Sequence, residues 1–315
     1  MISAARPLLL AAGSFAAIPL AAIPLAADPL ADNWAAQSKP LDGPIAWTMK
    51  ADDARTRAGK IHMSFEVRNG RDSRTSHSRD FALSALEGLS AQDLRGGAGR
   101  EVAFRYVQPA GRLACTGVAR ARAGAGECRF AGDAGFVDEL IRRGIGRPGE
   151  LQLFNLAMSG ADLAVLDELA RQGYPKPDVD GLVGLGIFNV TPGYVRELAA
   201  SGYRLRSTGD LIQFKIFDVT PAFIRDLRAL GYAQPAANDL VQFRIFRITP
   251  EFIRELGELG YRDVPAAKLV ELKIHGVTPA YIRGLSRAGI ARPGIEQLTR
   301  MRMTGFDPAR RGDAR

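Results

Sequence analysis

From about residue 131 onward, apolar positions follow a helical period, and the helical segments themselves recur. The recurring positions keep one constant interval through four segments. They are the Thr-Pro pairs Thr191-Pro192, Thr220-Pro221, Thr249-Pro250 and Thr278-Pro279, the leucines Leu198, Leu227, Leu256 and Leu285, and the aromatic residues Tyr194, Phe223, Phe252 and Tyr281. Several sets of equivalent positions keep the same spacing over four segments, which indicates a tandem repeat.

Each repeat predicts two short helices. In the first, a threonine such as Thr249 is a good N-cap, and Pro250 suits the first helical position. Apolar residues then fall on one helical face, and Gly260 is a typical helix end. The second segment of each repeat contains enough Ile and Phe to suit a strand as well as a helix. These segments are residues 210–217, 239–246 and 268–275. Because their apolar positions do not alternate cleanly, we predict a two-turn helix for each.

Weaker copies extend the pattern in both directions. Steps of the same interval back from Leu198 reach Leu169 and Leu140, and a step forward from Leu272 reaches Met301. A two-helix unit this small cannot bury its apolar face alone, so neighbouring units must stack. We predict an α-solenoid-like array of about six 29-residue helical hairpins over residues 131–308.

Residues 45–130 show the two-residue alternation of strands instead. The alternation is clearest around Phe65 and Phe104, and residues 81–89 suggest a strand entering a short helical turn. Two strands, near 112–119 and 125–131, form a predicted hairpin with its turn at 120–123. That hairpin places Cys115 and Cys128 opposite each other, which predicts a disulfide, with free thiols as the alternative. The fold class is therefore α+β, with a small antiparallel β domain of five or six strands before the array.

The first residues resemble a secretory signal peptide. Arg6 precedes an uncharged run of Ala, Leu, Ile and Pro that ends in small residues near Ala27. Cleavage there would leave a linker at 28–44 and place the protein in the periplasm or outside the cell. An uncleaved membrane anchor is the alternative, although Pro19 and Pro24 suit a membrane helix poorly. Residues 309–315 are expected to form a disordered tail.

A β hairpin followed by tandem VTPxFIRxLxxLGY units resembles a bacterial extracytoplasmic repeat family. The resemblance covers about Ile45 to Pro308, and its most specific phrase begins at Thr191, Thr220, Thr249 and Thr278. The family includes stand-alone secreted proteins and the outer C-terminal regions of membrane metallopeptidases of the beta-lactam-sensor antirepressor type. The resemblance implies no catalytic residues for this region. A His-Glu-x-x-His motif is absent, so no protease role is implied.

Candidate chemistry is sparse in the sequence. The histidines His62, His77 and His275 lie far apart, whereas a metal site needs clustered ligands. There is no Gly-x-Ser-x-Gly elbow and no phosphate-binding Gly-rich loop ahead of a helix. The sequence therefore predicts no metal, no cofactor and no enzymatic activity, with a hydrolase as the least favoured alternative.

Two sets of cations recur with the repeat. One is the arginine row, Arg196, Arg225, Arg254 and Arg283, and the other is the mixed cation row, Lys215, Arg244, Lys273 and Arg302. Stacked repeats would align each set into a groove for an acidic protein surface, a lipopolysaccharide phosphate or nucleic acid. Alternatively, each cation pairs with a nearby carboxylate or caps a neighbouring helix, which the adjacent Glu197, Asp226 and Glu255 favour.

The net charge of +8 permits anionic partners without requiring them. These observations predict an exported, non-enzymatic interaction protein with a protein partner in the cell envelope. Nucleic acid is not expected as a partner. An envelope sensor related to antirepressor ectodomains, and a polyanion-binding protein that uses the two cation rows, remain the alternatives.

Overall fold

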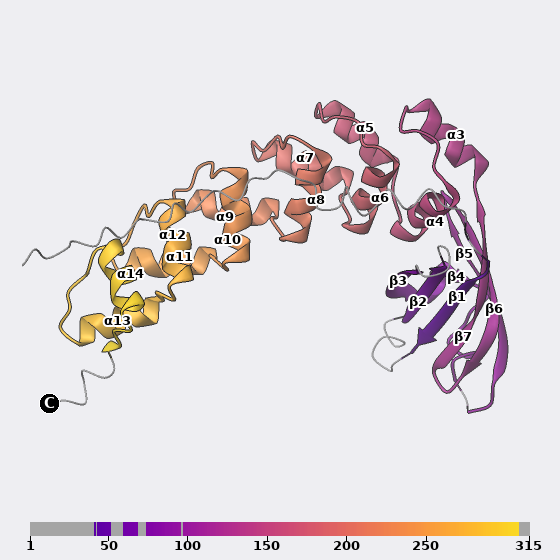
Figure 1. Ribbon diagram of the computed structural model, residues 1–315, viewed down its shortest axis with the longest axis horizontal. Helices are drawn as coiled ribbons and strands as arrows, with labels where there is room; N and C mark the ends of the chain where they lie inside the picture. Colours follow the sequence, from indigo (N-terminus) through magenta and orange to yellow (C-terminus); the bar gives the residue numbers. More distant parts are fainter. Residues whose placement is uncertain (1–40, 42, 52–58, 69–73, 96, 309–315) are drawn as a thin grey trace, which may run out of the picture.

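The computed structural model describes residues 41, 43–51, 59–68, 74–95 and 97–308. Its architecture is mixed, with a seven-stranded antiparallel sheet followed by twelve helices in the described residues. Figure 1 shows the helices following one another away from the sheet along a curved path. The predicted signal peptide, most of the predicted linker and the predicted tail lie outside the described residues.

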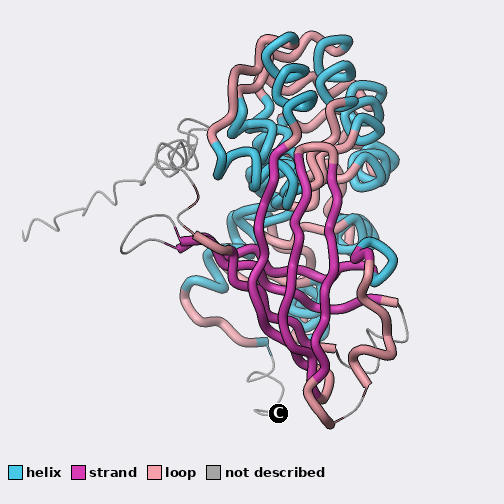
Figure 2. Tube along the Cα trace, turned by 90° about the vertical axis from the view of Figure 1, so that its right-hand side faces the viewer, coloured by secondary structure: helices cyan, strands magenta, loops and turns pink. Residues whose placement is uncertain are grey.

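The strands pair as neighbours in the order β3-β2-β1-β7-β6-β5-β4. Their bounds are β1 Ile45–Lys50, β2 Lys60–Arg68, β3 Arg74–Ala82, β4 Leu86–Glu87, β5 Arg100–Gln108, β6 Gly111–Arg120 and β7 Ala123–Gly132. Every pairing is antiparallel, and the sheet curls into a half-barrel (Figure 2). The prediction of a hairpin with its turn near 120–123 is confirmed, and so is the short helical turn, Leu83–Ala85, before β4.

The prediction of five or six strands is wrong, because the described residues contain seven. Strand β3 carries a weak sequence signal because it is an edge strand in which Phe81 is the buried residue. The alternation of apolar and polar residues is weak in this edge strand. Charged residues at a sheet edge discourage pairing with other chains. Strand β7 also extends past the predicted limit, to Gly132.

The helices are short and nearly uniform. Their bounds are α3 Ala134–Arg142, α4 Glu150–Ser159, α5 Ala164–Arg171, α6 Val179–Ile187, α7 Pro192–Ala200, α8 Thr208–Ile216, α9 Pro221–Ala229, α10 Ala237–Ile245, α11 Pro250–Glu258, α12 Ala266–Ile274, α13 Pro279–Arg287 and α14 Ile295–Met303. The second segments of the repeats are helices, α8, α10 and α12, so their strand alternative is wrong. Isolated helices of this length are marginal in water, so packing must stabilise them.

The predicted threonine caps are confirmed. Thr191, Thr220, Thr249 and Thr278 each accept a hydrogen bond from the backbone N–H three residues later, and each is followed by proline at the first helical position. Replacing such a cap with alanine typically costs about 1 kcal/mol. The earlier helices use other caps, such as Asp133 before α3.

Backbone positions after the helices also recur. Two series of residues with positive φ are Gly144, Gly173, Gly202, Gly231, Gly260 and Gly289, and Gly160, Asn189, Asp218, Arg247, Gly276 and Gly305. Both series keep the same interval as the Thr-Pro pairs. The first series follows the odd-numbered helices and the second follows the even-numbered ones. Left-handed residues end helices by satisfying free carbonyl groups.

Helices of the same series pack against one another. Contacts join α5, α7, α9, α11 and α13 in succession, and they also join α4 to α6, α6 to α8, α10 to α12 and α12 to α14. One continuous buried cluster runs from Phe136 of α3 to Leu298 of α14. Tyrosine hydroxyl groups connect successive loops, since Tyr203 donates to the Pro235 carbonyl at 2.8 Å and Tyr232 to that of Val264 at 2.6 Å. Burial raises the pKa of Tyr232 to about 12.

Helix α4 joins the sheet to the other helices. Its residues Leu151, Phe154 and Met158 belong to the core that fills the curved sheet. On its other side, Leu153 and Leu156 belong to the core shared by the helices. Both faces of α4 are therefore buried, and the buried residues include the polar Asn155 and Ser159.

Candidate functional site

The arginine row lies on the odd-numbered helices, and two of its four members, Arg196 and Arg283, form ion pairs between those helices. Arg196 of α7 donates to Glu168 of α5 at 3.2 Å, and Arg283 of α13 donates to Glu255 of α11 at 3.2 Å. In both cases the carboxylate belongs to the preceding odd-numbered helix. Glu168 is almost fully buried, and hydrogen bonds from Gln172 and then Arg196 hold the pKa of its carboxyl group below its usual value. These two arginines therefore connect successive helix pairs.

The mixed cation row lies on the even-numbered helices, and each cation is placed over an aromatic ring. The four pairs, with the distance from charged group to ring centroid, are Lys215 over Tyr194 at 4.9 Å, Arg244 over Phe223 at 5.0 Å, Lys273 over Phe252 at 4.1 Å and Arg302 over Tyr281 at 4.7 Å. Each pair joins an even-numbered helix to the odd-numbered helix before it. Such contacts contribute about 0.5–1 kcal/mol at exposed sites.

Arg244 shows how this row also reaches the preceding helix pair. Its Nε–H group donates to the carbonyl of Phe217, at the end of α8, at 3.1 Å. Its Nη2 atom forms an ion pair with Asp218. A cation at the carboxyl end of a helix is favoured by the helix dipole. For Arg244 the structural interpretation of the cation rows therefore has direct support.

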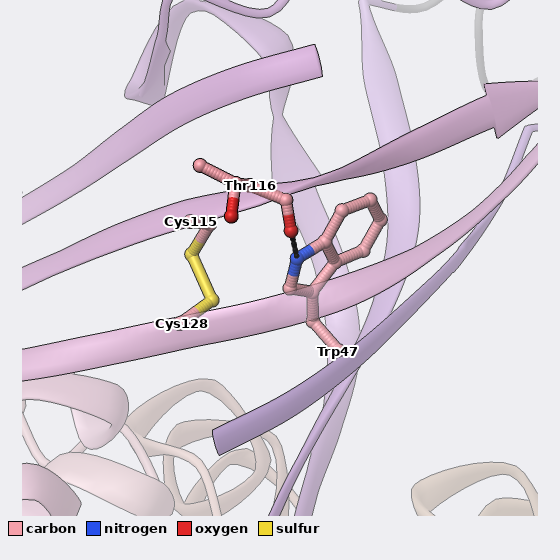
Figure 3. The surroundings of a disulfide bond; sticks show 4 residues. All are labelled: Trp47, Cys115, Thr116 and Cys128. Atoms are coloured by element: carbon pink, nitrogen blue, oxygen red, sulfur yellow. Dashed lines mark hydrogen bonds between the residues drawn. A yellow bond between two sulfur atoms is a disulfide. The ribbon is translucent and has the colours of Figure 1, made fainter. Parts of the chain in front are cut away.

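Cys115 and Cys128 lie directly opposite each other in the β6–β7 register and form a disulfide bond. Figure 3 shows the bond beside the indole of Trp47, whose Nε1–H group donates to the carbonyl of Thr116 at 3.1 Å. The two cysteines are buried, at 2% and 1% exposure. The disulfide joins neighbouring strands within the core of the sheet.

Replacing both cysteines with alanine is expected to lower the free energy of unfolding by about 2–3 kcal/mol, because the cross-link closes a short loop of the unfolded chain. The cysteines are separated by 13 positions in the sequence. Urea unfolding of the oxidised wild type and of the variant measures the difference. Wild-type protein treated with reductant should behave like the variant, and equal stability of the oxidised and reduced proteins would contradict the expectation.

The three histidines do not come together as one site. His62 lies on β2, where it bonds to Asp80 at 2.9 Å, and His275 follows α12. His77 of β3 lies 2.9 Å from the side-chain oxygen of Asn155, a buried residue of α4. Its ring also packs edge-on against Phe154, with centroids 5.5 Å apart. Within the described ranges, no group of three or more His, Cys, Asp or Glu residues is arranged to hold a metal ion.

His77 should make the stability depend on pH. Burial lowers the pKa of its imidazole below 6.5, an effect that Arg79 reinforces and the Asn155 hydrogen bond opposes. The unfolded chain therefore takes up a proton at higher pH than the folded chain. The contribution of His77 to the free energy of unfolding is complete above pH 6.5. It is lost as the pH falls through the lower pKa that His77 has in the folded chain. Urea unfolding at pH 7 and pH 5 should show a larger loss of stability for the wild type than for His77→Gln, and parallel losses would contradict this assignment.

The outer face of the sheet carries an open groove of about 1020 Å³ beside α4. Charged side chains of both signs line it, among them Glu87, Arg105, Glu127, Arg129 and Glu150. Arg105 and Glu87 form an ion pair at 3.5 Å. Because the signs alternate, the groove does not present a field of one sign to a ligand.

A third recurring set, which was not predicted from the sequence, is a row of exposed apolar side chains at the ends of α6, α8, α10, α12 and α14. This apolar row consists of Ile187, Ile216, Ile245, Ile274 and Met303. The isoleucines are 43–48% exposed and Met303 is 68% exposed. Their spacing, which equals that of the Thr-Pro pairs, is visible in the sequence. The exposure of these side chains cannot be predicted from the sequence, because neighbouring apolar residues in the same short helices are buried.

No family model, curated protein or solved structure matches this chain. The resemblance to the extracytoplasmic repeat family, and the sensor role that it implies, therefore stay predictions. In the part of the chain that the structure describes, no helix has both the length and the apolar character needed to span a membrane.

Proposed function

We propose that this protein is an exported, non-enzymatic interaction module. In this proposal, residues 131–308 form an α-solenoid-like array of six helical hairpins that presents an extended surface to another protein. The observation that carries the proposal is the recurrence of equivalent exposed side chains on successive helices. Repeat arrays commonly use such extended surfaces for binding.

Three further observations support the six-hairpin interpretation. Each series of left-handed helix ends has six members, and tyrosine hydroxyl groups connect successive loops. Contacts join α5 through α13 within the odd-numbered series and most neighbours within the even-numbered series. The first hairpin, α3–α4, differs from the others because α4 also covers the sheet. Terminal units of repeat arrays are commonly modified in this way.

The charge distribution favours a protein partner over a polyanion. Residues 131–308 contain 22 Arg and Lys against 21 Asp and Glu, so the helical part is almost neutral. The net positive charge of the chain lies mainly outside it. Cations such as Arg196 and Arg283 are also engaged with carboxylates. A polyanion site would instead concentrate unneutralised positive charge on one surface.

Export is supported by the character of the first residues and by the cross-strand disulfide. Structural disulfides persist in oxidising compartments such as the bacterial periplasm. Fractionation of cells that express the tagged chain tests this part of the proposal. We expect the protein in the periplasm or the medium with Cys115 and Cys128 oxidised, and a cytosolic, fully reduced protein would contradict export.

Capture from an envelope extract tests the binding role. With the full exported chain as bait, we expect a discrete protein to be retained with only a shallow dependence on salt, because the helical part is almost neutral and the proposed contact is mainly apolar. The variant Arg225→Glu/Arg254→Glu should retain the same protein. Retention that falls steeply with salt and disappears in this variant would identify polyanion binding instead. Retention of no specific protein would remove the support for an interaction module.

A further inference from the structure

We propose that the apolar row, Ile187, Ile216, Ile245, Ile274 and Met303, binds an amphipathic helix of the partner protein, with acidic residues along one side of its apolar stripe. This inference rests on the proposed function and names the surface and the partner chemistry. Three features of the structure lead to it, namely the covered first position of the row, its spacing and its charged border.

The first position of the row is already occupied within the chain. Met158 lies one repeat interval before Ile187, near the end of α4, and it is 2% exposed in the core of the sheet. The same helix position therefore makes an apolar contact in α4 and is left exposed in α6 through α14. The exposed row continues an interface that the molecule already uses.

The row is not a set of scattered surface residues. Each member is the last residue of its even-numbered helix, and three of the members are followed by a partly buried phenylalanine, at Phe188, Phe217 and Phe246. The apolar stripe is thus widest on α6, α8 and α10. Repeated apolar exposure along one line is typical of an interaction surface.

The spacing of the apolar row matches a bound helix better than a bound strand. Packed helices lie about 8–10 Å apart. Where successive even-numbered helices pack, as α6 does with α8, α10 with α12 and α12 with α14, the row therefore offers one apolar side chain at about that interval. On a helix lying along the row, residues seven positions apart are on one face and about 10.5 Å apart. Residues on one face of a strand repeat at about 6.7 Å and do not match. A helix with an apolar residue at every seventh position can therefore contact successive members.

The cations beside the apolar row indicate that the partner helix carries acidic residues. Each residue of the mixed cation row directly precedes a member of the apolar row, so it lies about 100° around the same helix. Among the described residues, Lys215 and Lys273 form no ion pair with a carboxylate, whereas Arg244 is paired with Asp218. Burial lowers the pKa of Lys273, and the nearby Arg247 lowers it further. Acidic side chains flanking the partner's apolar stripe would supply carboxylates to pair with Lys215 and Lys273.

Three synthetic helical peptides, each long enough to reach most members of the row, test the inference. One carries leucine at every seventh position with glutamates on one flank, one carries the same leucines with lysines on that flank, and one scrambles the first sequence. Fluorescence anisotropy with the full chain measures binding. We expect the glutamate peptide to bind at least tenfold more tightly than the lysine peptide, and the scrambled peptide to bind at least tenfold more weakly than the glutamate peptide.

Variants of the protein locate the binding site. Ile216→Ser/Ile245→Ser should weaken binding of the glutamate peptide at least tenfold. Ile141→Ser is the matched control, because Ile141 is 41% exposed on α3 but lies outside the row. Lys215→Glu/Lys273→Glu should reverse the preference, so that the lysine peptide binds more tightly. Circular dichroism and urea unfolding verify that each variant is folded.

Several outcomes would overturn the inference. These are equal binding of the three peptides, no measurable binding of the glutamate peptide, and loss of binding in the Ile141→Ser control alone. Self-association that Ile216→Ser/Ile245→Ser abolishes would make a second copy of the chain the occupant instead. If envelope capture succeeds and the row variants retain the partner normally, the proposed function stands and this inference fails.

Discussion

Replacing Phe154 with alanine is expected to lower the free energy of unfolding by about 3–5 kcal/mol, the usual range for a large buried aromatic side chain. Phe154 is fully buried on α4 and packs edge-on against Phe130 and His77, with centroids 5.6 and 5.5 Å away. Its removal leaves a cavity where the sheet meets the helices. The substitution therefore weakens the junction as well as the core of the sheet.

Urea unfolding followed by both tryptophan fluorescence and circular dichroism measures this effect. The described tryptophan, Trp47, lies in the sheet core, whereas the helices dominate the circular dichroism signal. In Phe154→Ala we expect the two transitions to separate, because the sheet has lost part of its contact with α4. The control Ile141→Ala, at an exposed position, should change stability by less than about 0.5 kcal/mol. A loss below about 1 kcal/mol in Phe154→Ala would contradict the assigned role of α4.

Replacing Leu227 with alanine should cost about 2–5 kcal/mol, the range for a buried leucine. Leu227 lies in the middle of the helical part, on α9, and is fully buried. Leu198 and Leu256 occupy the equivalent positions on α7 and α11 and are also fully buried. If the hairpins stack as equivalent units, the three leucines have equivalent surroundings, and their alanine variants should lose similar amounts of stability.

Chemical denaturation of the three single variants, followed by circular dichroism, measures these losses. Leu230→Ala provides a comparison on the same helix segment, because Leu230 is only partly buried at the end of α9. It should therefore lose less than Leu227→Ala. A negligible effect at Leu227, or losses at the three positions that differ by more than about 3 kcal/mol, would contradict equivalent packing of the helix pairs.

Much of the helical part could be predicted from the sequence because its signals are local. Thr220 and Pro221 specify a helix start within two residues, and the later Gly231 specifies an end. These signals recur in register, so each copy reinforces the others. The sheet hairpin was also predictable, because Cys115 and Cys128 fall at matching places in two alternating strands.

Other features depend on contacts that a local pattern does not contain. Strand β3 is polar because its neighbours are β2 on one side and no described strand on the other. Met158 and Ile187 occupy equivalent positions, yet the sheet buries only Met158. The ring beneath each member of the mixed cation row, such as Phe252 beneath Lys273, becomes apparent only when the two helices of a pair lie side by side.

The most direct test of the account is a deletion of one whole hairpin, residues 220–248, compared with a deletion of residues 220–234. The first removes one complete repeat and joins Val219 to Thr249, which restores the Val-Thr-Pro junction. The second removes only the segment of α9, so α8 would be followed directly by α10. Stacked hairpins predict that the whole-repeat deletion stays helical and unfolds cooperatively, whereas the shorter deletion loses cooperative unfolding. Equal disruption by both deletions would contradict the stacking of equivalent hairpins.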